Sequence, residues 1–275
     1  MVPAKSDENL GSPASNLSDP IEQSHPSPPT DSADLPPVQA EPLSAIFLSY
    51  NDQASLEKTL GQWTNELNSL QRDYEILLVD DASADGWREL GQSLAAKFPR
   101  IRLIRHETRR SFGACLRTGL AAARFPLLLV STCDGQYQPG DLQKFFKWID
   151  KVHLVCGFRT VDGRRYSRTW TGGIYHWLIR IIFGLRLKDP ECWFFLARRS
   201  MFTRIPIQSN GPFALAEILA KANFLTCLMA EVAVSYRQVP EAAAKWSAVT
   251  LRQKLAGFRR VFSYPDFGPA NLTET

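Results

Sequence analysis

The 275-residue sequence has no apolar run that approaches the roughly 20 residues a membrane-spanning helix requires. Its first residues also lack the hydrophobic stretch of a secretory signal. We therefore expect a cytoplasmic protein whose contact with a membrane is peripheral, on the cytosolic face.

Cysteine and histidine are scarce and scattered. The five cysteines never occur as C-x-x-C, and the four histidines form no H-E-x-x-H. These absences argue against a zinc site and against a disulfide framework. The sequence also has no Walker A loop, no G-x-G-x-x-G and no G-x-S-x-G, which disfavours nucleotide hydrolases, dinucleotide oxidoreductases and serine hydrolases.

Aromatic residues are absent from residues 1–42. This segment holds nine of the 18 prolines, seven Asp or Glu residues and one Lys, which gives a net charge of −6. It offers too little apolar surface to offset the entropy of ordering the chain, so we predict a disordered tail. The other residues carry 31 basic and 21 acidic side chains, a net charge of +10, and this balance favours anionic ligands.

From residue 43 onward, short apolar segments alternate with amphipathic ones. The apolar segments predict strands at 43–50, 75–81, 101–105 and 126–132, and the amphipathic segments predict helices at 55–67, 87–98 and 112–124. Strands that are apolar throughout and separated by helices indicate an α/β fold with a mainly parallel sheet covered on both faces. We expect one folded domain over 43–240, followed by a C-terminal helix and tail over 241–275.

Acidic or amide residues follow three of the predicted strands. The strand ends carry Asn51 and Asp52, Asp80 and Asp81, and Asp134. Asp and Asn are common after strands simply because they favour turns. In open parallel sheets, however, ligands bind outside the carboxyl ends of the strands, so three such ends together predict a binding site.

Four segments carry a resemblance to a known family. They are SAIFLSYNDQASLEKTL, YEILLVDDASADG, RRSFGACLRTGLAAA and STCDGQYQPGDL, in that order. Together they resemble glycosyltransferase family 2, and within it the branch of dolichyl- or polyprenyl-phosphate sugar transferases. The resemblance runs from about residue 44 to about residue 237 and implies a GT-A fold, in which helices flank a Rossmann-like, mainly parallel sheet.

The resemblance implies a nucleotide-sugar donor. Its nucleoside would lie at the first strand end and at the D-D-x-S-x-D turn, where carboxylates accept hydrogen bonds from base and ribose. The helix that begins after Arg110 would turn its N-terminal amides toward the donor phosphates. The residues implied for donor binding are Tyr50, Asn51, Asp52, Asp80, Asp81, Ser83, Asp85, Gly113 and Thr132.

The resemblance also implies a divalent cation, Mg²⁺ or Mn²⁺. The family's D-x-D motif reads Thr132-Cys133-Asp134 here, so that Thr132 replaces the first Asp. A cation between protein and diphosphate needs only one or two carboxylates, because substrate oxygens and water complete its coordination. Asp134 is therefore the implied metal ligand and catalytic residue.

The acceptor half contains a basic cluster and a short apolar segment. Four arginines between 157 and 168 precede residues 174–185, and twelve residues cannot span a bilayer. The apolar segment suits either an interfacial helix at an anionic membrane or a core helix packed on the sheet. A lipid phosphate is already ionised near neutral pH and needs no base to take a proton, unlike a sugar hydroxyl. We expect such an acceptor to be held by Gln136, Arg164, Arg165, Arg168 and Arg237, and Asp189 matches the family's D-x-x-C-G-F segment as a second catalytic candidate.

Two functional hypotheses follow. The first is an inverting glycosyltransferase that moves a sugar from a nucleotide-sugar donor to a polyprenyl-phosphate-type acceptor at the cytosolic membrane face. The second is a degenerate GT-A domain that binds a nucleotide or a partner without catalysis. Thr132, and Trp193 in place of the family's Gly, favour the second hypothesis. Nucleic-acid binding is not expected, because the basic residues are not interleaved with aromatics on a recognisable module.

Overall fold

The computed structural model describes residues 41–165, 177, 179–239, 258–259, 263 and 266–267. Residues 1–40 of the predicted tail and Arg168 lie outside these residues, and so does most of the predicted C-terminal segment 241–275. The side chains of Arg164 and Arg165 are likewise outside the description. The domain boundaries at 42 and 240 therefore stay predictions.

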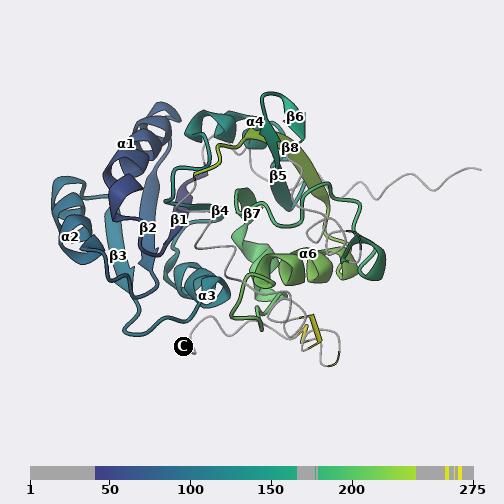
Figure 1. Ribbon diagram of the computed structural model, residues 1–275. Helices are drawn as coiled ribbons and strands as arrows, with labels where there is room; N and C mark the ends of the chain where they lie inside the picture. Colours follow the sequence, from purple (N-terminus) through teal and green to yellow (C-terminus); the bar gives the residue numbers. More distant parts are fainter. Residues whose placement is uncertain are drawn as a thin grey trace, which may run out of the picture. The chain divides into compact units, whose positions relative to one another are not determined.

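Within the described residues, eight strands form one sheet with helices around it (Figure 1). The strands are β1 Leu43–Ser49, β2 Tyr74–Asp80, β3 Ile101–Arg105, β4 Leu127–Thr132, β5 Leu154–Val161, β6 Arg164–Arg165, β7 Phe195–Arg198 and β8 Met229–Ser235. The α-helices are α1 Gln53–Ser69, α2 Trp87–Lys97, α3 Phe112–Ala122, α4 Leu142–Phe146 and α6 Ala214–Phe224, with 3-10 turns η2 Pro139–Asp141 and η3 Arg199–Thr203. The predicted strands and helices are confirmed, with bounds that differ by no more than two residues.

The sheet is parallel in its first half and mixed beyond it. Its order is β3-β2-β1-β4-β7-β5-β6, and β8 pairs with β5. The pairs β3-β2, β2-β1, β1-β4 and β5-β8 are parallel, whereas β7 and β6 run antiparallel to their neighbours. The mainly parallel α/β sheet expected from the sequence is therefore confirmed.

Helices cover both faces of the parallel half, as the wholly apolar strands predict. Successive side chains of a strand point to opposite faces. Ile46 of β1 lies against Gly119 of α3, where an added Cβ would come within 2.4 Å of its methyl group. The next residue, Phe47, packs its ring 5.0 Å from that of Trp63 in α1. All residues of β1 are consequently buried, and the polar groups of the strand are satisfied by its two neighbours.

The register aligns the carboxyl ends of the three central strands. Ser49 of β1 pairs with Asp80 of β2, and Leu48 pairs with Thr132 of β4. The loops that follow these strands therefore leave the sheet at one edge, which is where the acidic residues lie. None of the described helices has the length and apolar character needed to cross a membrane.

Candidate active site

The loops after β1 and β2 are joined by reciprocal hydrogen bonds. The N–H of Asn51 donates to Oγ of Ser83 over 2.8 Å, and the N–H of Ala84 donates to Oδ1 of Asn51 over 2.9 Å. The N–H of Gln53, the first residue of α1, donates to Oδ2 of Asp85 over 2.9 Å. Three residues predicted for donor binding, Asn51, Ser83 and Asp85, thus join the two loops at the rim of the site.

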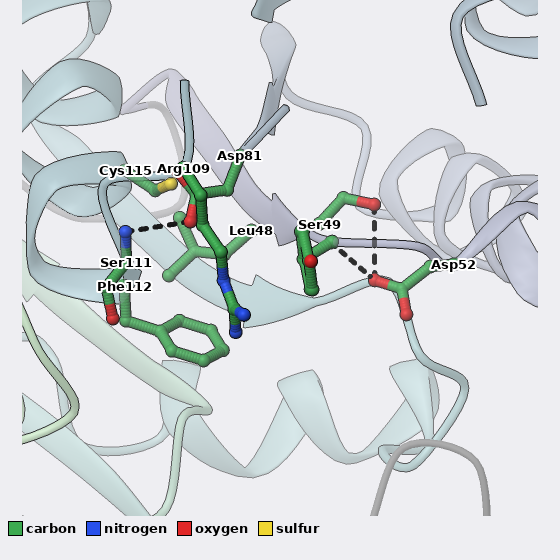
Figure 2. Close-up of a pocket in the computed structure, with 9 residues that line it drawn as sticks. Leu48, Ser49, Asp52, Asp81, Arg109, Ser111, Phe112 and Cys115 are labelled. Carbon is green, nitrogen blue, oxygen red and sulfur yellow. Dashed lines mark hydrogen bonds between the residues drawn. The ribbon is translucent and has the colours of Figure 1, made fainter. Parts of the chain in front are cut away.

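A pocket opens at the carboxyl ends of β1 and β2 (Figure 2). It is lined by Leu48, Ser49, Tyr50, Asp52, Asp81, Arg109, Ser111, Phe112 and Cys115. In Figure 2, Asp52 and Asp81 lie on opposite sides, with the guanidinium of Arg109 between them. That guanidinium lies 4.1 Å from the centre of the Tyr50 ring. The carboxylate of Asp52, two aromatic rings and apolar side chains together suit a ligand with both a flat ring and hydroxyl or N–H donors.

Asp52 is held rigidly at the start of α1. Its Oδ2 accepts hydrogen bonds from the N–H of Tyr50 over 3.0 Å and from the hydroxyl of Ser49 over 3.2 Å. Its backbone carbonyl accepts from the N–H groups of Ser55 and Leu56, which begins the helix. These bonds fix the direction of the carboxylate before any ligand arrives.

Asp80 and Asp81 have different surroundings although they are neighbours. Asp80 is fully buried, accepts hydrogen bonds from Ser83, and forms an ion pair with Arg105 at 2.5 Å. Burial raises the pKa of Asp80 in spite of these partners. Asp80 therefore fixes the turn after β2, whereas Asp81 reaches the pocket.

Asp134 lies beside the first turn of α1. Its Oδ1 accepts hydrogen bonds from the hydroxyl of Thr132 over 2.9 Å and from the N–H of Gln136 over 3.1 Å. The hydroxyl of Ser55 contacts the carbonyls of both Cys133 and Asp52, at 2.9 and 3.2 Å, so it ties the two acidic loops together. Burial raises the pKa of the Cys133 thiol, and the charges of Asp52 and Asp134 raise it further.

The oxygen atoms of Asp134 and Thr132 are suitable ligands for a divalent cation. A buried carboxylate with a hydroxyl at hydrogen-bond distance offers the oxygen ligands that Mg²⁺ and Mn²⁺ prefer. Thr132 contributes a neutral oxygen where the family has a second carboxylate. The site is therefore suited to a cation whose other ligands come from the substrate.

Asp189 is engaged by a buried arginine. The Nε and one terminal nitrogen of Arg159 donate to its two carboxylate oxygens over 2.6 and 2.7 Å, and the backbone N–H of Arg159 donates over 3.2 Å. Burial alone would lower the pKa of Arg159, but the carboxylate of Asp189 holds it well above the usual value. The catalytic role proposed for Asp189 stays a prediction, and the geometry gives this residue a structural role as well.

The predicted acceptor residues that are described lie next to Asp134. The side-chain amide of Gln136 donates to the hydroxyl of Tyr236 over 2.8 Å, and the N–H of Arg237 donates to the carbonyl of Gln136 over 2.8 Å. The guanidinium of Arg237 reaches the carbonyl of Gly135 at 3.3 Å. The end of β8 is thereby brought to the end of β4, although the two are a hundred residues apart in sequence.

The sequence predicted that the first amides of α3, near Gly113, face the donor phosphates. The structure instead shows the amide of Gly113 bonded within the protein. Its N–H donates to the carbonyl of Asn210 over 2.7 Å. An added Cβ at this glycine would come within 1.9 Å of the carbonyl oxygen of Ser209. The start of α3 is thus packed against the 209–210 segment, and glycine is required there for this close approach.

Several residues of the site were not identified from the sequence. Ser49, Arg109, Ser111, Phe112 and Cys115 line the pocket, and the ring of Phe112 stacks on that of Trp193 with centroids 5.0 Å apart. The backbone N–H of Trp193 donates to the hydroxyl of Tyr137 over 3.1 Å. The segment RRSFGAC pointed to this region, but sequence pattern alone does not tell which of its side chains face a cavity.

Comparison with known proteins indicates a family for this chain. The profile of Glycosyl transferase family 2 matches residues 44–216. The dolichyl-phosphate beta-glucosyltransferase of Mus musculus is 26% identical over 232 residues, covering 74% of this chain and 71% of that protein. The undecaprenyl-phosphate mannosyltransferase of Micrococcus luteus is 31% identical over 156 residues, covering 52% of this chain and 61% of that protein.

A solved structure shows the same fold. The crystal structure of glucosyl-3-phosphoglycerate synthase from Mycobacterium tuberculosis, in complex with Mn²⁺, UDP and phosphoglyceric acid, superposes with a TM-score of 0.63. The two chains are 17% identical, and the match covers 83% of this chain and 81% of the other. The GT-A fold expected from the sequence is confirmed.

Proposed function

The chain belongs to glycosyl transferase family 2 and is a glycosyltransferase; from this membership we propose that it moves one sugar, with inversion, from a nucleotide-sugar donor to a polyprenyl-phosphate acceptor. The observation that carries the proposal is the pocket at the carboxyl ends of β1 and β2, with Asp134 tied to its Asp52 side through Ser55. Relatives from a mammal and a bacterium are named as transferases to dolichyl and undecaprenyl phosphate, which supports this acceptor class.

The pocket is assigned to the nucleoside of the donor. Tyr50 and Phe112 offer faces for a planar base, and Asp52 offers carboxylate oxygens to donors on base or ribose. Arg109 carries a positive charge at the same opening, where it can meet the diphosphate. A pocket that combines aromatic and apolar side chains with a carboxylate and a guanidinium fits a nucleoside diphosphate better than a sugar alone.

The leaving diphosphate is assigned to the Asp134 side of the site. Asp134 and Thr132 are the residues that would hold Mg²⁺ or Mn²⁺, and the similar mycobacterial structure contains Mn²⁺ together with UDP. When bound, the cation would neutralise negative charge that develops on the diphosphate as it leaves. Gln136 N–H and Thr132 hydroxyl keep the carboxylate of Asp134 in place.

The acceptor is assigned to the side formed by Gln136 and Arg237. An oxygen of the lipid phosphate forms the new bond to the anomeric carbon, while the bond from that carbon to the diphosphate breaks and the nucleoside diphosphate leaves. A single displacement of this kind inverts the anomeric centre. The phosphate is already ionised, so no side chain has to take a proton. Cationic groups such as Arg237 are what this step needs.

The proposal is tested by donor consumption. We expect the purified chain, supplied with polyprenyl monophosphate and a divalent cation, to release nucleoside diphosphate from one member of a panel of UDP-, GDP- and dTDP-sugars. Release should depend on the acceptor and stop when the cation is chelated. If no donor is consumed under any of these conditions, the non-catalytic GT-A hypothesis is favoured instead.

Membrane contact is assigned to the apolar segment 174–185. Its described part is helical at residues 177 and 179–182. Ile179 and Phe183 are buried, while Trp177 and Ile181 are 61% and 59% exposed. One face of this helix therefore packs into the core, and the other presents apolar side chains. We propose that this exposed face enters the interface of an anionic membrane.

Replacing Trp177 and Ile181 together by serine should reduce sedimentation with vesicles that contain anionic lipid. The reason is that both side chains lie on the exposed face, so their loss removes apolar contact with lipid and leaves the core intact. Trp148→Ser is the matched control, since Trp148 is 46% exposed but follows α4. Binding to the vesicles should also weaken as the salt concentration rises. The reason is that attraction between exposed basic side chains and anionic lipid is screened beyond about 10 Å at 0.1 M salt. Equal loss of binding in the control would contradict this assignment.

A further inference from the structure

A buried histidine stands directly behind the pocket. His106 follows β3 and is 6% exposed. Its Nδ1 lies 3.0 Å from Oδ1 of Asp81, and its Nε2 lies 2.9 Å from the hydroxyl of Thr118 in α3. Neither the sequence pattern nor the proposed reaction gives this histidine a role, yet both of its ring nitrogens are engaged.

The geometry around His106 is that of a hydrogen-bond network. Asp81, His106 and Cys115 each place one potential metal-ligand atom within 4.8 Å of the others, and they form such a group among the described residues. They could therefore form a metal site as well as a hydrogen-bond network. Burial, followed by the charge of Asp81, raises the pKa of the Cys115 thiol far above its usual value, which keeps the thiol protonated. A carboxylate only accepts hydrogen bonds, so Nδ1 donates to Asp81, while Nε2 shares a hydrogen bond with the hydroxyl of Thr118.

The carboxylate of Asp81 also holds a segment of the pocket wall. Its Oδ1 accepts the N–H of Arg110 over 2.8 Å, and its Oδ2 accepts the N–H of Ser111 over 2.7 Å. We name residues 109–112 the pocket loop, since Arg109, Ser111 and Phe112 line the pocket. Asp81 thus faces this loop with both of its oxygens.

The pocket loop needs such an anchor because its backbone is strained. Ser111 has a φ of +73°, a region that residues other than glycine adopt at a cost. The strain occurs at the residue whose N–H donates to Asp81 and which immediately precedes α3. Charge-assisted hydrogen bonds to a buried carboxylate are strong enough to hold a segment in such a conformation.

We propose that His106 is a positioning residue for donor binding: it fixes the carboxylate of Asp81, which in turn latches the pocket loop in the conformation that lines the nucleotide pocket. The consequence for affinity rests on the proposed function, while the latch itself is a property of the free protein. Asp81 then acts on the donor through the loop, since its oxygens are directed at Arg110 and Ser111.

Two histidine replacements of similar polarity separate the latch from a general loss of packing. His106→Asn keeps an N–H donor near the place of Nδ1 and loses the contact with Thr118. His106→Gln places its amide near Nε2 and loses the contact with Asp81. His153→Ala is the control, because Nδ1 of the exposed His153 also accepts a hydrogen bond, from the N–H of Leu228, but does so just before β5, which does not adjoin β2 or β3 in the sheet.

Hydrogen exchange in the full-length protein without ligand tests the latch. We expect the amides of Arg110 and Ser111 to exchange about tenfold faster in His106→Gln than in the wild type, as for the loss of one hydrogen bond of ordinary strength. His106→Asn and His153→Ala should keep wild-type exchange in the pocket loop. Equal exchange in His106→Asn and His106→Gln would overturn the latch. Stoichiometric zinc in the purified protein, lost in both variants, would also overturn it, because the metal would take the place of the Nδ1 proton.

Titration with UDP, GDP and dTDP tests the consequence for the donor. The nucleotide that binds the wild type should bind His106→Gln about tenfold more weakly and His106→Asn almost normally. Unchanged affinity in His106→Gln would overturn the positioning role. If the wild type binds none of the three nucleotides, the proposed function is contradicted, and the exchange result still decides whether the latch exists.

Discussion

Asp134→Asn should lower the rate of sugar transfer by about 10²–10³-fold, the effect typical of removing one electrostatic group at a reaction centre. Asparagine retains an oxygen that can accept from the hydroxyl of Thr132 and the N–H of Gln136, the two bonds that hold Oδ1. The fold should therefore persist while the negative charge is lost. Initial rates of nucleoside diphosphate release, measured beside thermal unfolding, check this expectation.

Two further variants sharpen the Asp134 experiment. Asp150→Asn is the control, because Asp150 is an exposed carboxylate in the turn after α4. Thr132→Asp restores the first Asp of the family's D-x-D motif, next to Asp134. The added carboxylate should tighten Mn²⁺ binding. In the metal-free protein it should lower the stability, because the two carboxylates repel each other. Wild-type turnover in Asp134→Asn would refute the assignment of the leaving diphosphate to this side chain.

Asp189→Ala should destabilise the protein by about 3–5 kcal/mol, because removing one partner of a buried ion pair leaves the other charge without compensation. Arg159 and Asp189 are 6% and 7% exposed and are joined by two side-chain hydrogen bonds. A loss of this size is a large part of the free energy of unfolding of a typical domain, which is about 5–15 kcal/mol. Urea unfolding followed by circular dichroism measures it.

The comparison with a surface pair shows whether burial is the cause. Asp73 and Arg100 form an ion pair at 3.9 Å with side chains 83% and 49% exposed, so Asp73→Ala should cost less than about 1 kcal/mol. Replacing Arg159 by Met in the Asp189→Ala background should recover part of the lost stability, since no buried charge remains. If Asp189→Ala unfolds at the wild-type urea concentration but lacks activity, its role is catalytic rather than structural.

The parallel half of the sheet could be predicted because its signal is local. The strand predicted at 75–81 has an uninterrupted apolar centre at residues 76–79, and an amphipathic helix follows it within a few residues. An apolar run without alternation indicates a strand that is buried on both faces. Strands of a parallel sheet are buried in this way because helices cover both faces of the sheet. The acidic residues at the strand ends could be located for the same reason, since the end of an apolar run is visible in the sequence.

The remaining parts depend on contacts between distant segments, which no local pattern encodes. The antiparallel strand β7 lies between β4 and β5, although Phe195 is more than sixty residues beyond β4 in the chain. The partner of Asp189 is Arg159, which the sequence grouped with the other arginines of the basic cluster between 157 and 168. His106 gave no signal, because a lone histidine after a strand has no periodicity and its partners lie in β2's loop and in α3.

Phe112 stacks on Trp193 where the proposed donor site and the proposed acceptor site adjoin. Phe112 belongs to the nucleotide pocket, whereas Trp193 follows Asp189 and is bonded to Tyr137, beside the acceptor residue Gln136. With donor and acceptor placed as proposed, we expect a ligand that displaces one ring to displace the other, so that the two binding free energies are coupled. Coupling of this kind is reciprocal: the factor by which acceptor changes donor affinity equals the factor by which donor changes acceptor affinity. We therefore expect cooperativity between the two proposed substrates to depend on this pair of aromatic rings.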